Sequence, residues 1–147
     1  EFRRVLFRSR YPWCMEPLSK LVFDCFDKRL RERLSQELCD ELDNIEQFDL
    51  GVNLYILSNQ SKAFGAGCIL YENVISNFAR VQDSNVYILP SSVHEVMLVP
   101  EDDDILPEFL YGLLADANRS SVGLIDLLSD NLYYFDRETN NITIFNV

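Results

Sequence analysis

The sequence is poor in the residues that bind metals and transfer protons. Its 147 residues include one histidine and four cysteines, Cys14, Cys25, Cys39 and Cys68, with no CxxC pair among them. A structural zinc site requires clustered cysteine and histidine ligands, and a disulfide-stabilised domain requires a denser set of cysteines. We therefore expect no metal and no cofactor, and we interpret the cysteines as free, mostly buried thiols.

Long hydrophobic runs are also missing, although 48% of the residues are hydrophobic. No run approaches the ~20 apolar residues that a membrane span needs, and no apolar segment of a secretory signal follows the N-terminal arginines. We therefore expect a cytoplasmic protein that does not enter a membrane. A chain of this length and composition supplies one hydrophobic core, which predicts a single domain.

Basic residues are scarce in most of the chain. Residues 41–147 contain 17 acidic side chains but only four basic ones, Lys62, Arg80, Arg119 and Arg137, and the whole sequence has a formal net charge of -11. Direct binding of nucleic acid requires lysine and arginine to neutralise phosphates. We therefore expect no direct contact with nucleic acid and predict a basic protein as the partner.

The N-terminal third divides into two segments of different character. Residues 1–9, "EFRRVLFRS", resemble translated adapter or cloning sequence at the edge of a metagenomic contig. We expect residues 1–10 to be a non-native or disordered leader before a single domain at 11–147, and the natural protein to begin further upstream. Over 16–48, apolar residues recur mostly every three or four positions, which predicts a long amphipathic helix. The apolar stripe of this helix must pack against another surface. That surface would be a sheet of the same chain, a partner's helix in a homodimer, or missing upstream sequence.

From residue 51 onwards the pattern changes to short elements. We predict strands in "VNLYILSN", "GAGCILY", "VYILP" and "EVMLVP", and helices in "ENVISNFARVQ", "DILPEFLYGLLADAN" and "GLIDLLSD". The segment "LYYFDRETNNITIF" predicts a hairpin, because asparagine tolerates positive φ at its turn. Short connections favour antiparallel pairing. The predicted fold class is α+β: a mainly antiparallel sheet covered by helices, with the long N-terminal helix packed across it.

Four motifs carry a resemblance to a known family. They are "YILSNQSKAFGAGCILYENVISNFA", "NVYILPSSVHEVMLVPED", "LLADANRSSV" and "LSDNLYYFDRETN". In this order and at these separations they resemble the C-terminal half of an uncharacterised bacterial family, domain of unknown function 5688, found mainly in Firmicutes. The likeness covers about residues 52–147. It implies a bacterial or phage-borne origin and a longer natural chain, and it implies no established activity.

The segment "YILPSSVHEV" collects the side chains of a nucleophilic site. Ser91 or Ser92 could be the nucleophile, His94 the base and Glu95 the orienting acid, but Glu95 would point to the opposite face of an extended strand. Alternatively, Cys68 could act with His94 in a small hydrolase or transferase. A structural turn explains the same residues without any catalytic geometry. In a turn, the serines bond the local backbone and the histidine caps the turn or packs on an aromatic side chain. We prefer the turn and expect no catalytic residues.

Two glycines, Gly65 and Gly67 of "FGAGC", raise the question of a phosphate-binding loop. Such a loop leads directly into a helix with a lysine, whereas a strand-like "CILY" follows here. We therefore expect a bulge or a closely packed strand.

The acidic run "EDDD" contains Glu101, Asp102, Asp103 and Asp104. It lacks the alternating ligands and the glycine of a calcium loop, and its place before "ILPEFLYGLL" predicts charges at a helix N-terminus. We expect these four residues to contact the partner. The predicted function is a small acidic protein-interaction module: an inhibitor or nucleic-acid mimic from a phage or mobile element, acting on a basic nucleic-acid-handling protein.

Overall fold

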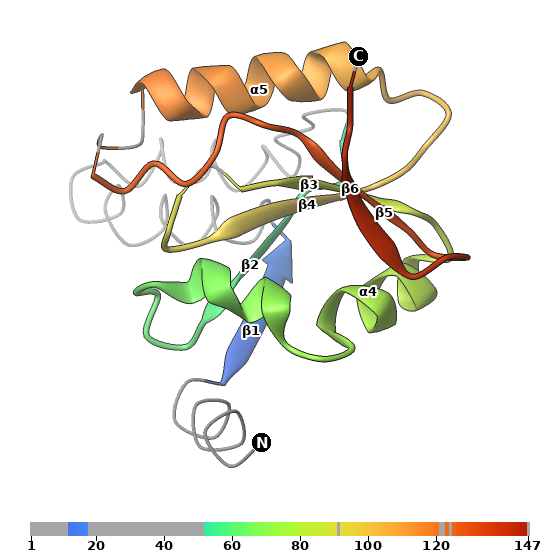
Figure 1. The fold of residues 1–147 in the computed structure, drawn as a ribbon, viewed down its shortest axis with the longest axis horizontal. Coiled ribbons are helices and arrows are strands. Elements are labelled where there is room, and N and C mark those ends of the chain that lie inside the picture. Colours follow the sequence, from blue (N-terminus) through green and yellow to red (C-terminus); the bar gives the residue numbers. More distant parts are fainter. Residues whose placement is uncertain (1–11, 18–51, 91, 121–122, 124, 147) are drawn as a thin grey trace, which may run out of the picture.

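A computed structural model describes residues 12–17, 52–90, 92–120, 123 and 125–146 (Figure 1). These residues form one six-stranded sheet in the order β1-β2-β4-β3-β5-β6, and every neighbouring pair is antiparallel. The strands are β1 (Trp13–Pro17), β2 (Tyr55–Asn59), β3 (Val86–Leu89), β4 (Val96–Pro100), β5 (Tyr133–Asp136) and β6 (Asn141–Ile144). The helices are the 3-10 helix η1 (Gly65–Leu70), α4 (Val74–Gln82) and α5 (Pro107–Ser120).

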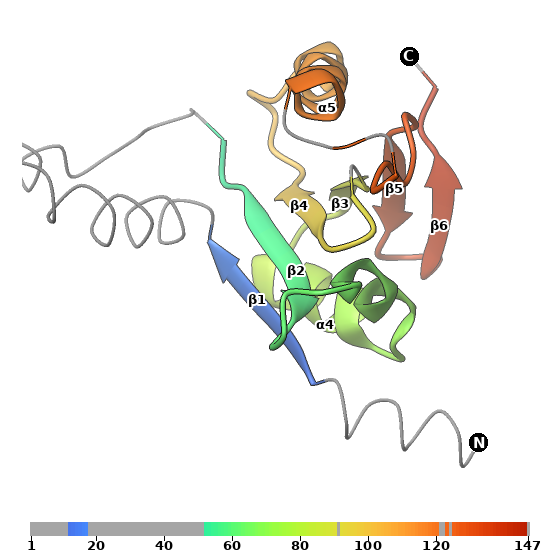
Figure 2. The ribbon, with the colours of Figure 1, turned by 90° about the vertical axis from the view of Figure 1, so that its left-hand side faces the viewer.

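The sheet has a hydrophobic cluster on each face. Helix α5 lies over one face, while η1 and α4 lie on the other (Figures 1 and 2). Alternation along β3 sends Val86 and Ile88 to the α4 face and Tyr87 and Leu89 to the α5 face. All four residues are buried, because helices pack on both faces of the sheet at this central strand.

Both α-helices form where apolar residues repeat at helical spacing. Helix α4 buries Val74, Ile75, Phe78 and Ala79, and its C-terminal neighbour Asp83 has φ 55 and donates its N–H back to the last turn. Helix α5 places Leu110 and Leu114, four residues apart, on the sheet. No helix in the described ranges has the length and apolar character needed to cross a bilayer.

The hairpin between β5 and β6 confirms the prediction made from "DRETNN". Asn140 has φ 56, the positive value for which asparagine is suited. The Asp136 carboxylate accepts the backbone N–H groups of Glu138 at 2.8 Å and Thr139 at 3.1 Å. The Thr139 N–H is the main cause that lowers the pKa of Asp136. The turn is therefore closed by a side chain from the strand that enters it.

The predicted α+β class is wrong. The described residues form a mostly β fold, a six-stranded antiparallel sheet with only three short helices, and they include no long N-terminal helix. The helix predicted over 16–48 begins inside β1, because Glu16 pairs with Ile56 and Pro17 with Tyr55. Its remaining positions, 18–48, lie outside the described residues, as do the predicted leader at 1–10 and any helix-mediated homodimer.

Two shorter elements also differ from the prediction. "GAGCILY" forms η1 rather than a strand, since the Gly65 and Ala66 N–H groups bond the carbonyls of His94 at 3.0 Å and Val93 at 3.2 Å. "GLIDLLSD" is not a helix in its described residues, because its backbone bonds the β3–β4 connection instead. There the Val93 N–H donates to Asp126 at 2.8 Å, and Ser92 forms an isolated bridge with Leu127.

Candidate functional site

The Glu101 carboxylate is held just after β4 by side chains from neighbouring elements. Its Oε2 accepts the Tyr134 hydroxyl at 2.9 Å and the Asn85 amide at 2.8 Å. The Tyr87 hydroxyl lies 3.5 Å from Oε1. The Glu101 N–H also donates to the Asn85 carbonyl at 2.8 Å. Of the four predicted partner-binding acids, Glu101 is therefore the one that anchors its loop to the sheet.

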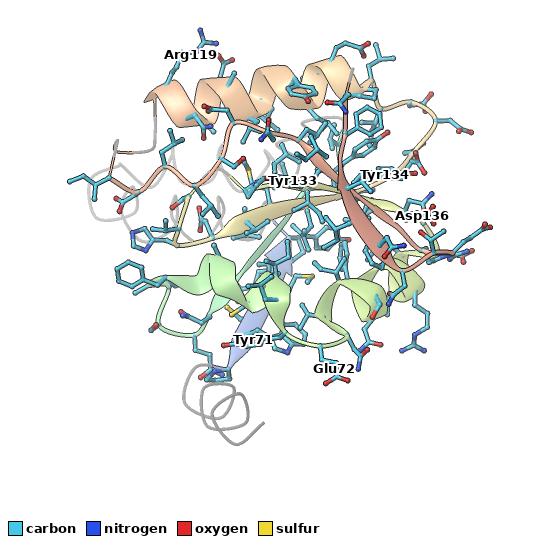
Figure 3. The ribbon with its side chains drawn as sticks, viewed as in Figure 1. Tyr71, Glu72, Arg119, Tyr133, Tyr134 and Asp136 are labelled. Carbon is cyan, nitrogen blue, oxygen red and sulfur yellow. The ribbon has the colours of Figure 1, made fainter. Side chains whose placement is uncertain are left out.

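The surroundings of Glu101 raise the pKa of both phenols. Burial is the largest cause for Tyr134, labelled on β5 in Figure 3, and the hydrogen bond and charge of Glu101 add to it. Burial and Glu101 also raise the pKa of Tyr87, and Glu108 contributes. Each phenol keeps its proton at neutral pH and remains a donor to the carboxylate.

Asp102, Asp103 and Asp104 leave the sheet with exposed side chains. The Asp104 N–H donates to Asp102 Oδ1 at 3.3 Å, and the Ile105 N–H donates to the Asp102 carbonyl at 3.1 Å. These bonds close a turn before α5, whose first turn contains a different acid, Glu108. The prediction that the run lies at the helix start is therefore wrong, and the three aspartates form a separate acidic turn.

The basic side chains of the described residues bond to groups elsewhere. Lys62 lies 4.0 Å from Glu16, Arg119 lies 3.0 Å from Asp116, Arg137 pairs with Asp83, and Arg80 donates to Asn77 at 3.4 Å. The described ranges contain fourteen acidic side chains and these four basic ones. Within that part of the chain, no basic side chain is paired with the acidic turn at 102–104.

His94 lies in the β3–β4 connection and uses both ring nitrogens. Its Nδ1 accepts the Phe64 N–H at 3.0 Å, and its Nε2 lies 3.3 Å from Asp126 Oδ1. Because Nδ1 is an acceptor, the ring proton of the neutral imidazole is on Nε2 and faces the carboxylate. The Phe64 and His94 rings are 5.2 Å apart between centroids. These are the contacts expected of a histidine that closes a turn and packs on an aromatic.

Ser92 also serves the turn. Its Oγ accepts the backbone N–H of His94 at 3.0 Å, so the hydroxyl closes a local side-chain turn. The carboxylate at the imidazole is Asp126 and not the neighbouring Glu95. Ser91 lies outside the described residues. The structure thus brings His94 and an acid together, but it bonds the Ser92 hydroxyl to backbone and not to the imidazole.

Cys68 is buried in the cluster beneath η1, with 2% of its surface exposed. Burial raises the pKa of this thiol, which disfavours the nucleophilic thiolate. Among the hydrogen bonds of the described residues, none joins Cys68 to His94, whose nitrogens bond Phe64 and Asp126. The described contacts therefore contain no bonded pair of thiol and imidazole.

Sequence reasoning missed several residues of these sites. Phe64 and Asp126 are far from His94 along the chain, and no motif links the three. The strand patterns that contain Tyr87 and Tyr134 predict no role for their hydroxyls. No group of three or more His, Cys, Asp or Glu side chains suited to a metal ion occurs in the described residues.

The fold and its sites define a small acidic domain built on an antiparallel sheet, with an anchored acidic turn at one end of β4 and a histidine-closed loop at the other. A protein-family model described as "Family of unknown function (DUF5688)" matches residues 7–137, and the chain belongs to this family. The match extends the resemblance seen at 52–147 towards the N-terminus. No curated protein and no solved structure matched the chain.

Proposed function

We propose that this chain is a small acidic protein-interaction module that binds a basic protein through Asp102, Asp103 and Asp104. One observation carries the proposal: the three exposed carboxylates form a turn anchored by Glu101, while every basic side chain of the described residues bonds elsewhere. The turn therefore presents concentrated negative charge on a fixed support.

Such a surface acts mainly on the encounter with a partner. Complementary charge raises the association rate, and the anchored turn loses little conformational freedom on binding. A basic groove that normally binds nucleic acid matches this chemistry. The proposal thus includes an inhibitor or nucleic-acid mimic from a phage or mobile element, acting in the cytoplasm on a nucleic-acid-handling protein.

The alternative, a small hydrolase or transferase using Cys68 with His94, has less support. The thiol is buried, and the imidazole nitrogens bond other groups. Cys68→Ser separates the two proposals, because the interaction module should keep its binding while an enzyme would lose its activity.

The acidic turn is tested by a charge-matched pair of variants. The first converts Asp102, Asp103 and Asp104 to asparagine, which keeps the oxygen that accepts the Asp104 N–H. The second, a control, removes the same charge elsewhere through Glu95→Gln, Asp130→Asn and Glu138→Gln. Association rates with purified basic nucleic-acid-binding proteins are measured by stopped flow at increasing salt.

The turn variant should associate about tenfold more slowly than the parent, with a smaller change in dissociation, because exposed charges mainly steer encounter. The control should stay closer to the parent. Salt should slow the parent steeply, since the Debye length falls to about 8 Å near physiological ionic strength. Equal rates for both variants and the parent, independent of salt, would contradict the proposal.

A further inference from the structure

Strand β6 forms one edge of the six-stranded sheet, beyond β5 (Figure 2). Among the described residues no strand pairs with its outer side, and all of its residues are exposed. Residues 1–11 and 18–51, which lie outside the described ranges, join the chain at β1 and β2, at the opposite edge. An edge strand of this kind offers its outward backbone groups to another strand.

One hydrogen bond fixes which backbone groups of β6 face outwards. The Phe145 N–H donates to the Leu132 carbonyl at 2.8 Å and so faces β5. Backbone groups alternate in direction along an antiparallel strand, so those of Thr143, two residues earlier in the same register, also face β5. The N–H and C=O groups of Ile142 and Ile144 therefore point away from the sheet.

The rest of the fold holds both ends of β6. The Phe145 carbonyl accepts the Tyr111 hydroxyl at 2.6 Å, and the Phe145 ring lies 5.4 Å from the Tyr87 ring between centroids. At the start of the strand, the Asp136 carboxylate closes the preceding turn through two backbone N–H groups. A strand held in this way loses little conformational entropy when another strand pairs with it.

The strand lacks the charges and the proline that protect many sheet edges. Residues 139–147, "TNNITIFNV", contain no charged side chain, although the sequence has 24 acidic and 13 basic ones. The register between β5 and β6 is also free of bulges. By contrast, the opposite edge strand β1 contains Glu16 and Pro17, residue types that discourage pairing. The sequence thus leaves β6 open to pairing where β1 is protected.

We propose that β6 pairs antiparallel with β6 of a second copy of this chain, across a two-fold axis at Thr143. In this register Ile142 of each copy pairs with Ile144 of the other, and every outward N–H and C=O group of these residues gains a partner. Thr143 lies opposite the same residue of the second copy, in a cross-strand threonine pair. An identical strand therefore satisfies the whole edge.

Charge and side-chain packing both favour a second copy at this strand. Two chains that each have a net charge of -11 repel one another, and they repel least where neither presents a charged side chain. Ile142 pairs with Phe135 and Ile144 with Tyr133, both of the α4-side cluster, so the two isoleucines lie on that side of the sheet. They are 46% and 49% exposed, and pairing brings the isoleucines of the two copies into contact.

The contact is small, because β6 has only 4 residues. It buries less than the about 1,200–2,000 Å² that is typical of stable complexes, so we expect a weak dimer with a Kd of about 0.1–1 mM. Salt should strengthen this dimer by screening the repulsion between copies, whereas it should weaken the binding of a basic partner at Asp102 to Asp104. The opposite responses to salt keep the two proposals separate, so failure of either leaves the other standing.

The dimer is measured by sedimentation equilibrium of the intact chain at about 0.01–1 mM protein. The parent should pass from monomer towards dimer over this range, with tighter association at about 0.15 M than at about 0.01 M ionic strength. Amide hydrogen exchange then locates the contact. The Ile142 and Ile144 N–H groups should exchange rapidly in dilute protein and more slowly as the concentration rises, while the Thr143 N–H, directed to β5, stays protected throughout.

Variants assign the dimer to β6. Thr143→Lys places like charges opposite one another at the axis and should weaken the dimer at least about fivefold. Gln60→Lys makes the same change of charge at an exposed residue away from β6, so this control should not weaken the dimer. Ile144→Pro removes an outward N–H that β5 does not use and should weaken the dimer at least about tenfold. Urea denaturation checks that each variant is folded.

Three results would overturn the proposal. A parent that remains monomeric at about 1 mM leaves the edge to an extended segment of another protein. Dimerisation that is unchanged in Thr143→Lys and Ile144→Pro places the contact elsewhere. Ile142 and Ile144 amides that are protected even in dilute protein show that the same chain covers the edge.

Discussion

Gly65 lies where β2, η1 and the β3–β4 connection meet. A Cβ at this position would collide with Ser58 Oγ and lie 2.5 Å from the Asn59 nitrogen and 2.7 Å from the His94 carbonyl oxygen. Two of these three atoms belong to the backbone and cannot rotate away. Glycine is therefore required here by close approach of the chain, although the segment is the 3-10 helix η1 and not the bulge or closely packed strand that the sequence predicted.

The first prediction is that Gly65→Ala destabilises the fold by about 3 kcal/mol or more, because overpacking against backbone forces the loop apart. The unfolding free energy is measured by urea denaturation. Gly67→Ala is the control: a Cβ there meets nothing within 4 Å, so its effect should stay within about 1 kcal/mol. Equal losses in the two variants would show that the close approach does not determine stability.

The second residue-scale prediction concerns His94, the one histidine of the chain. Its Nδ1 accepts the Phe64 N–H at 3.0 Å, so a side chain without an acceptor at this position leaves that N–H unpaired. His94→Leu should therefore lower the unfolding free energy by about 1 kcal/mol or more, measured by urea denaturation.

The control is His94→Asn, whose side-chain oxygen can take the place of Nδ1 as the acceptor of the Phe64 N–H. This variant should lose less stability than His94→Leu. If the two variants are equally stable, the hydrogen bond from the Phe64 N–H to position 94 does not contribute to stability.

At the scale of elements, Glu101 joins β4 to β3 and β5 through tyrosine hydroxyls. Tyr87 and Tyr134 have a higher pKa in the folded chain than the ordinary value of 10.0. The folded state therefore holds these protons more tightly than the unfolded state. Their contribution to stability is complete below about pH 10 and is lost as the pH rises through the folded pKa values.

The third prediction follows from the raised pKa values of these two tyrosines. The unfolding free energy should fall from about pH 10 upwards, by at most about 1.4 kcal/mol per pH unit for each proton that differs. Urea denaturation at a series of pH values measures the slope. Tyr134→Phe should reduce the slope above pH 10, and at pH 7 it should cost about 1–2 kcal/mol because Glu101 loses a donor. If the unfolding free energy of this variant falls above pH 10 as steeply as that of the parent, Tyr134 does not contribute to the loss of stability at alkaline pH.

At the scale of the whole molecule, the acidic excess opposes compaction. The net charge of -11 is concentrated after residue 40, where four basic side chains face 17 acidic ones. Like charges repel one another more strongly in the folded chain than in the expanded one. Ion pairs such as Arg137 with Asp83 contribute in the opposite direction, but exposed pairs are weak.

The fourth prediction is that moderate salt stabilises the protein. The Debye length shrinks from about 30 Å at 0.01 M to about 8 Å at 0.15 M ionic strength, which screens the repulsion. The unfolding midpoint should rise over this range, by an amount equivalent to about 1 kcal/mol. Sodium chloride is compared with uncharged sucrose to separate screening from exclusion effects. A midpoint that falls with salt would show that attractive pairs outweigh repulsion.

The sequence by itself determined the features that depend on composition and on neighbouring residues. Net charge follows from counting side chains, whatever the fold. The sequence predicts a strand in "VNLYILSN", a helix in "ENVISNFARVQ" and a turn around Asn140, because alternation, helical spacing and φ preference are local properties. The structure has these elements as Tyr55–Asn59, Val74–Gln82 and the β5–β6 turn. The family resemblance also came from residues in order along the chain, and the family match confirms it.

The tertiary structure decided what depends on contacts between distant residues. Strand β2 pairs with β4 and not with β3, and this crossover sets the loop in which His94 meets Phe64 and Asp126. The tertiary structure also decided that "GAGCILY" forms η1, because carbonyls of the β3–β4 connection accept the N–H groups of Gly65 and Ala66. Local strand propensity contains no information on which distant backbone will lie beside a segment. Hydrogen bonds from "GAGCILY" to the β3–β4 connection therefore outweighed its strand propensity.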